Sequence, residues 1–173
     1  MPWLSLKLPT NQRRYLLTKL CKYFFNNSQI TSPISSQIPV YKGASRGLVH
    51  EYVDPNPEGP YHGTNGFNDV QLKTQPDISK VKDGAASAIL RLVDENPNQV
   101  KIVALGPLTN IATCLAMDEK FSSKLAGLSL MGGNSKGIGN VTTCAEFNFY
   151  ADPEAALVVL NRCKMQHPIK VLP

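Results

Sequence analysis

The sequence of 173 residues lacks the features that mark several common classes of protein. It has no apolar run near the roughly 20 residues that a membrane-spanning helix needs. It has no G-x-x-x-x-G-K-S/T loop and no G-x-G-x-x-G sequence opening a helix, so it offers no standard cradle for nucleotide phosphates. None of its four cysteines is paired at C-x-x-C spacing, which argues against a zinc site and favours a cytoplasmic over a secreted protein.

Acidic residues are absent from residues 1–50, which carry seven Lys or Arg. Of the 18 basic residues in the chain, 11 therefore lie beyond residue 50, together with all 13 acidic residues. The excess of positive charge belongs to the start of the chain. We therefore expect no nucleic-acid partner for the folded body.

Residues 1–33 are predicted to be a basic N-terminal extension, distinct from a folded domain over residues 34–173. Composition alone leaves three alternatives for the extension: a poorly ordered segment, a short basic helix over residues 12–25, or a targeting segment. A secretory signal is disfavoured, because the extension has no long apolar stretch. We expect a cytoplasmic protein, with a targeting role for the extension left open.

Beyond residue 38, strand-like apolar runs alternate with helical periodicity. Residues 100–105 are apolar apart from one lysine, which is typical of a strand buried in a parallel sheet. Strands are expected at 38–44, 100–105, 125–131 and 168–172, and helices at 78–95, 108–117 and 152–160. This alternation predicts an α/β fold with an open, mostly parallel sheet.

Two turns, residues 106–110 and 132–148, follow predicted strands at their carboxyl ends. In parallel sheets these ends share one rim, and ligands bind there. The second turn contains Asn140, Glu146 and Asn148, whose carboxylate and carboxamides suit the hydroxyls of a sugar. Glu146 and Asn148 share a face if the backbone is extended. The alternative is that Asn140 serves only as a turn residue and Asn148 caps backbone groups.

Two further residues are candidates for a site. Thr109, like its neighbour Asn110, lies just past a strand, where a backbone carbonyl left free by Pro107 suits a hard cation such as calcium. The alternative is that Thr109 and Asn110 cap the helix that follows. His62 lies in a loop rich in Pro, Gly and Asn, where it could reach a base or leaving group; the alternative is an exposed loop histidine.

Five motifs together resemble the inosine-uridine preferring nucleoside hydrolases. They are IPVYKGA, HGTNGFNDV, KIVALGPLTNIA, LMGGN and GNVTTCAEFNFYADPEAA, and they cover about residues 38–173. The resemblance implies an open α/β fold related to the Rossmann topology, a bound calcium ion and a homo-oligomer. It also implies an enzyme that cleaves the N-glycosidic bond of purine or pyrimidine ribonucleosides with a calcium-activated water.

The resemblance also implies roles for individual residues. Asn140, Glu146 and Asn148 look like the ligands of the ribose hydroxyls, and Met131 resembles a residue that packs near the sugar. The Thr109 carbonyl looks like a calcium ligand, and His62 resembles a histidine on the side of the nucleobase.

The sequence departs from the family in its acidic residues. The family opens with a DTDxGxDD motif that supplies the general base and the calcium carboxylates, whereas residues 1–50 contain no Asp. The family's later His–Asp pair has no counterpart up to Pro173. We therefore expect an incomplete nucleoside hydrolase domain with no retained general base and weak or absent calcium binding. We also expect a parallel sheet with unpaired backbone where its first strand is missing. The alternative function is an inactive fragment or isoform that binds ribonucleosides or forms hetero-oligomers.

Overall fold

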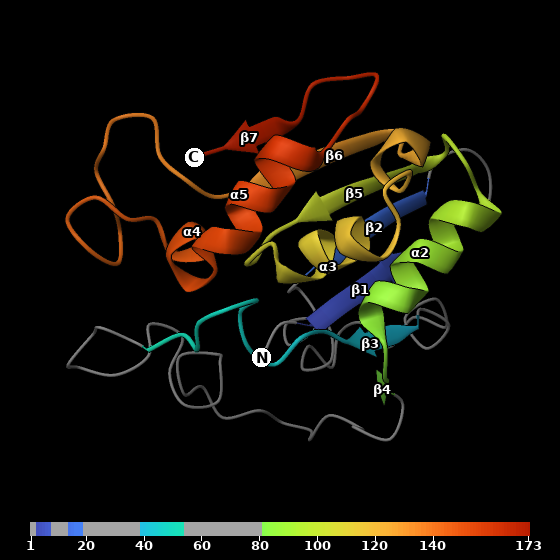
Figure 1. Ribbon diagram of the computed structural model, residues 1–173, viewed down its shortest axis with the longest axis horizontal. Helices are drawn as coiled ribbons and strands as arrows, with labels where there is room; N and C mark the ends of the chain where they lie inside the picture. Colours follow the sequence, from blue (N-terminus) through green and yellow to red (C-terminus); the bar gives the residue numbers. More distant parts are fainter. Residues whose placement is uncertain (1–2, 8–13, 19–38, 54–80) are drawn as a thin grey trace, which may run out of the picture.

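The computed structural model describes residues 3–7, 14–18, 39–53 and 81–173 (Figure 1). The strands in these residues are β1 (Trp3–Lys7), β2 (Arg14–Thr18), β3 (Val40–Lys42), β4 (Val81–Lys82), β5 (Val100–Ala104), β6 (Gly127–Met131) and β7 (Lys170–Leu172). The helices are α2 (Ala85–Glu95), α3 (Thr109–Met117), the short 3-10 helix η3 (Ser122–Lys124), α4 (Phe147–Ala151) and α5 (Pro153–Arg162).

The described strands form a single sheet in the order β4-β3-β1-β2-β5-β6-β7. The pairs β3–β4, β2–β5, β5–β6 and β6–β7 are parallel, whereas β1 runs antiparallel to both β2 and β3. The helices α2, α3 and α5 lie over one face of this sheet (Figure 1). The prediction of an α/β fold with an open, mostly parallel sheet is confirmed.

Two strands come from the stretch that the sequence analysis treats as an extension. Arg14–Thr18 pairs residue by residue with Val100–Ala104, so a helix over residues 12–25 is wrong where β2 lies. The strand β5 is therefore paired on both edges, by β2 and by β6. The unpaired backbone expected of a sheet without its first strand is not found beside β5.

The core lies between the sheet and the three longer helices. Alternate residues of the two central strands are buried, namely Val100, Ile102 and Ala104 of β5 and Leu128 and Leu130 of β6. They form one cluster with buried helical residues, which include Ile89, Val93, Ile111, Leu115 and Val159. Burying a side chain of this size contributes about 1.5–3 kcal/mol.

Among the described residues, no helix is long and apolar enough to span a bilayer.

Cys114 of α3 is part of this core and is a free cysteine. Burial raises the pKa of the Cys114 thiol to about 12. The thiol is therefore protonated at neutral pH, and Cys114 is excluded as a nucleophile.

The helix predicted from residue 78 begins later, at Ala85. Val81–Lys82 is instead the strand β4, which pairs in parallel with β3. Gly84 separates the two elements with a φ of 81°, a left-handed conformation that cannot continue into a right-handed helix. The helix ends as predicted before Pro97, because a residue that precedes proline is disfavoured in the helical region.

We expect Leu16→Pro to destabilise the chain strongly. Leu16 lies opposite Leu6 of β1 and Ile102 of β5, and a proline inside a sheet removes a ladder hydrogen bond. A large share of a typical stability of about 5–15 kcal/mol should be lost. Urea unfolding of the full chain measures this, with Leu16→Val as the control because valine keeps the N–H. Equal midpoints for the two variants would show that β2 is not a central strand.

Candidate functional site

The carboxylate of Glu146 joins the carboxyl end of β6 to the start of α4. Its Oε2 accepts hydrogen bonds from the backbone N–H of Gly133 (2.8 Å) and of Phe149 (3.2 Å). Its Oε1 accepts one from the N–H of Asn148 (2.9 Å). Three charge-assisted bonds of this kind compensate a half-buried carboxylate for the water that it loses.

The condition under which Glu146 and Asn148 would share a face, an extended backbone at both residues, is not met. Only Glu146 is extended (φ −83°, ψ 145°), and it is the N-cap of α4, in which Asn148 lies. The cause is the Glu146 side chain, which satisfies two of the backbone N–H groups that a helix leaves free at its start. A helix cap therefore joins the Glu146 carboxylate to the backbone N–H of Asn148.

Asn148 is buried, with 1% of its surface exposed. Its Nδ2 donates to the carbonyl oxygen of Met131 at the end of β6 (2.8 Å). Among the described residues, two buried side-chain oxygens lack a partner, and Asn148 Oδ1 is one of them; the other is Oε2 of Glu154. A buried acceptor without a partner costs free energy, so it marks a place where a donor from a ligand would be stabilising.

Asn140 holds the turn that leads into α4. Its side-chain oxygen accepts from the N–H of Phe147 (2.8 Å), and its own N–H donates to the carbonyl of Ala145 (3.0 Å). The alternative roles for Asn140 and Asn148, as a turn residue and a partner of backbone groups, are thus both seen in the structure. They leave the buried Asn148 Oδ1 atom without a hydrogen-bond partner.

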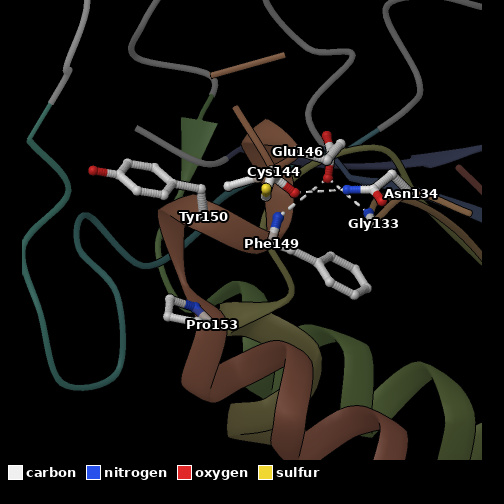
Figure 2. Close-up of a pocket in the computed structure, with 8 residues that line it drawn as sticks. Gly133, Asn134, Cys144, Glu146, Phe149, Tyr150 and Pro153 are labelled. Carbon is white, nitrogen blue, oxygen red and sulfur yellow. Dashed lines mark hydrogen bonds between the residues drawn. The ribbon is translucent and has the colours of Figure 1, made fainter. Parts of the chain in front are cut away.

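An open pocket of about 490 Å³ lies beside Glu146 (Figure 2). A volume of this order suits a small molecule. The pocket is lined by Gly133, Asn134, Cys144, Ala145, Glu146, Phe149, Tyr150 and Pro153. Glu146 is the one predicted sugar ligand in its lining; Met131, Asn140 and Asn148 are placed around the same turn and outside that lining.

Asn134 lines the pocket but is not among the residues predicted from the sequence. Its Nδ2 donates to the carbonyl of Cys144 (2.8 Å), and its Oδ1 accepts from the N–H of Gly137 (2.7 Å). It therefore closes the loop between β6 and α4. Its place in the LMGGN motif directly after a strand was the available signal, but an Asn after two glycines is equally typical of an ordinary turn.

The described residues do not fit a calcium ion. The Thr109 carbonyl, predicted as a calcium ligand, accepts the hydroxyl of Thr113 inside α3 (2.8 Å). Among the described residues, no group of three or more His, Cys, Asp or Glu side chains is placed to hold a metal. Calcium takes six to eight oxygen ligands, usually with several carboxylates. A single neutral carbonyl does not meet that need.

The other predicted residues are placed as follows. Asn110 is buried, and its Oδ1 accepts from the N–H of Ala44 (3.0 Å). Asp152 is the N-cap of α5, and its carboxylate also accepts the hydroxyl of Thr109 (2.6 Å), which no local pattern signals. His62 lies outside the described residues.

Comparison with known proteins gives one consistent family. The sequence model described as "Inosine-uridine preferring nucleoside hydrolase" matches residues 18–173. Uridine nucleosidase 1 of Arabidopsis thaliana is 41% identical over 124 residues, which are 72% of this chain and 36% of that protein. The pyrimidine-specific ribonucleoside hydrolase RihA of Salmonella arizonae is 36% identical over 126 residues, which are 73% of this chain and 39% of that protein.

Solved structures agree with the sequence comparison. An inosine-guanosine nucleoside hydrolase aligns with a TM-score of 0.66 and 32% identity, covering 88% of this chain and 44% of that one. A purine-preferring ribonucleoside hydrolase from Gardnerella vaginalis aligns with a TM-score of 0.65 and 29% identity, covering 76% of this chain and 40% of that one. The chain thus spans less than half the length of these relatives.

We expect Gly132→Ala to destabilise the site. A Cβ at Gly132 would lie 2.7 Å from two ring carbons of Phe149 and 3.2 Å from Oε2 of Glu146, so the Phe149 ring would have to move. Overpacking of this kind costs about 1–3 kcal/mol. Gly127→Ala is the matched control, because its nearest neighbour is Cγ of Lys101 at an ordinary 3.6 Å. Urea midpoints measure both variants, and equal midpoints would contradict the close packing.

Proposed function

Because the chain belongs to the inosine-uridine preferring nucleoside hydrolase family, we propose that its site binds the ribose of a ribonucleoside, and that the whole protein cleaves the N-glycosidic bond with water. The names of the relatives support this reading, since they include a uridine nucleosidase and a pyrimidine-specific ribonucleoside hydrolase. The observation that carries the proposal is the buried, unpaired Oδ1 of Asn148, a residue whose backbone N–H donates to the Glu146 carboxylate.

The acceptors at this site match a sugar. A ribose hydroxyl donates one hydrogen bond, and Asn148 Oδ1 has no other donor among the described residues. The Glu146 carboxylate is held in place by backbone amides, so it loses little freedom when a ligand arrives. Its Oε1 accepts one hydrogen bond and keeps room for another. Asn140 restrains the turn that places both residues.

The same groups favour cleavage of a glycosidic bond. As the bond to the base breaks, the sugar gains oxocarbenium character and positive charge. A fixed carboxylate near the sugar stabilises that charge without reorganising. Contacts to hydroxyls that tighten as the ring distorts lower the barrier further. Glu146 and Asn148 would therefore bind the transition state more strongly than the substrate.

No described residue is assigned here as the base that activates the attacking water. Calcium would supply a Lewis acid that orients and activates this water in the family's reaction, but the described residues do not fit the ion. This observation favours a second candidate, a chain that binds ribonucleosides without turning them over. Assays of the full chain with inosine and uridine in the presence of calcium separate the two, because release of free base requires turnover.

We expect Asn148→Ala to weaken ribose binding about tenfold, the usual effect of losing a buried hydrogen-bond partner. Isothermal titration of the full chain with ribose and with uridine measures the affinity. Asn161→Ala on the exposed side of α5 is the matched control and should bind as the unaltered chain does. Equal affinities of the Asn148 variant and the control would exclude Asn148 as a sugar ligand.

We expect calcium to stabilise the chain very little. A weakly bound ligand raises stability only in proportion to its occupancy, so 1 mM calcium should shift the melting temperature by less than about 1 °C. Thermal melts with calcium and with a chelator measure this. A rise of several degrees would contradict this expectation.

A further inference from the structure

Residues 44–52, the strap, run from the end of β3 past the amino ends of α3 and α5. The N–H of Ala44 donates to Oδ1 of Asn110 in α3 (3.0 Å). The N–H of Leu48 donates to Oδ2 of Asp152 at the start of α5 (3.1 Å). Nδ1 of His50 lies 3.0 Å from Oε1 of Glu154 in α5. The strap is therefore tied to two helices that are distant from it in sequence.

Asp152 is the central tie. Asp152 is 1% exposed. It is both the C-cap residue of α4 and the N-cap residue of α5. Its Oδ1 accepts from the N–H of Ala155 (3.0 Å), and its Oδ2 accepts from the Thr109 hydroxyl (2.6 Å) and the Leu48 N–H (3.1 Å). Bonds to an ionised acceptor are roughly twice as strong as neutral ones.

The strap also passes close to this carboxylate. A Cβ built at Gly47 would lie 2.7 Å from the carbonyl oxygen of His50 and 3.3 Å from Cγ of Asp152. The backbone of the strap is thus folded tightly against Asp152, and its course depends on that contact.

At its far end the strap carries Tyr52 to the candidate site. The Tyr52 ring lies edge to face with Phe147 (centroids 5.5 Å apart, 74°) and with Tyr150 (6.1 Å, 88°). Phe147 stands between Glu146 and Asn148 in the chain, and Tyr150 lines the pocket. The three rings form a cluster next to the sugar contacts. Such a cluster suits a flat aromatic group more than a free sugar.

We propose that Asp152 is a positioning residue of the nucleoside site: its carboxylate fastens the strap and thereby holds Tyr52 against Phe147 and Tyr150. This inference rests on the proposed function. It implies that loosening the strap weakens the binding of a nucleoside, which carries an aromatic base, and leaves the binding of ribose alone intact. General damage to the site would weaken both.

The variant Asp152→Asn distinguishes the positioning of Tyr52 from general damage to the site. An Asn side chain can still accept from the Ala155 N–H and can donate to the Thr109 oxygen, but it then presents an N–H to the N–H of Leu48. In the full chain we expect the Leu48 amide to exchange with solvent at least about tenfold faster. Uridine should bind about tenfold more weakly and ribose within about twofold of the unaltered chain.

Asp118→Asn is the matched control. Its carboxylate accepts from the Lys120 N–H (2.8 Å) and from Nζ of Lys124 (2.7 Å) beyond the carboxyl end of α3, and it touches neither the strap nor the pocket. This variant should leave Leu48 exchange and both affinities unchanged. Tyr52→Leu leaves the hydrogen bonds of Asp152 in place. It should weaken the binding of uridine as much as Asp152→Asn does, without weakening the binding of ribose. This variant tests the inference if Asp152→Asn fails to fold.

The outcomes are distinct. A selective loss of uridine binding with faster Leu48 exchange supports the inference. Unchanged exchange, or equal losses for uridine and ribose, overturns it while the proposed function stands. If the unaltered chain binds neither uridine nor ribose, the proposed function fails and the role of Asp152 in a nucleoside site fails with it.

Discussion

A partly buried carboxylate needs hydrogen-bond donors, and the candidate site is organised by how Glu146 finds them. Its donors are the backbone amides of Gly133, Asn148 and Phe149, which belong to the turn after β6 and to the start of α4. This requirement turns the chain into a helix at residue 147. Glycine at position 132 leaves room for the Phe149 ring, with which a side chain there would collide. The turn after β6, the start of the short helix and the pocket lining thus all include the Glu146 carboxylate or its hydrogen-bond donors.

The site leaves one polar atom unsatisfied, and that cost is informative. The rest of the network is well paired: Asn140 caps Phe147, and Nδ2 of Asn148 bonds the end of β6. A native fold rarely leaves a buried acceptor such as Asn148 Oδ1 without a donor, and exceptions gather where ligands bind. A hydroxyl donor at Asn148 Oδ1 would recover that cost, which is why the unpaired atom supports the proposed binding of ribose.

Much of the fold could be read from local patterns, and the failures have physical causes. The apolar runs predicted as buried strands are β5 and β6, and Asp152 with Pro153 marks the start of α5. These predictions succeed because burial and capping depend on only a few neighbouring residues. The predicted start of α2 was wrong, because hydrophobic periodicity does not reveal the left-handed backbone conformation of Gly84. The place of Arg14–Thr18 beside β5 was also missed, because strand pairing joins segments that are about 86 residues apart.

The sequence by itself determined the alternation of strands and helices, the family motifs and the kinds of polar group at the rim. These depend on side-chain chemistry and short spacings. Only the tertiary structure decided which groups meet. Asp152 accepts hydrogen bonds from Leu48 and Thr109, which lie 104 and 43 residues away, and the Thr109 carbonyl is turned into α3 toward Thr113. The physical reason is that a hydrogen bond needs its partners within about 3 Å. For residues so far apart, packing of the helices on the sheet brings them within that distance.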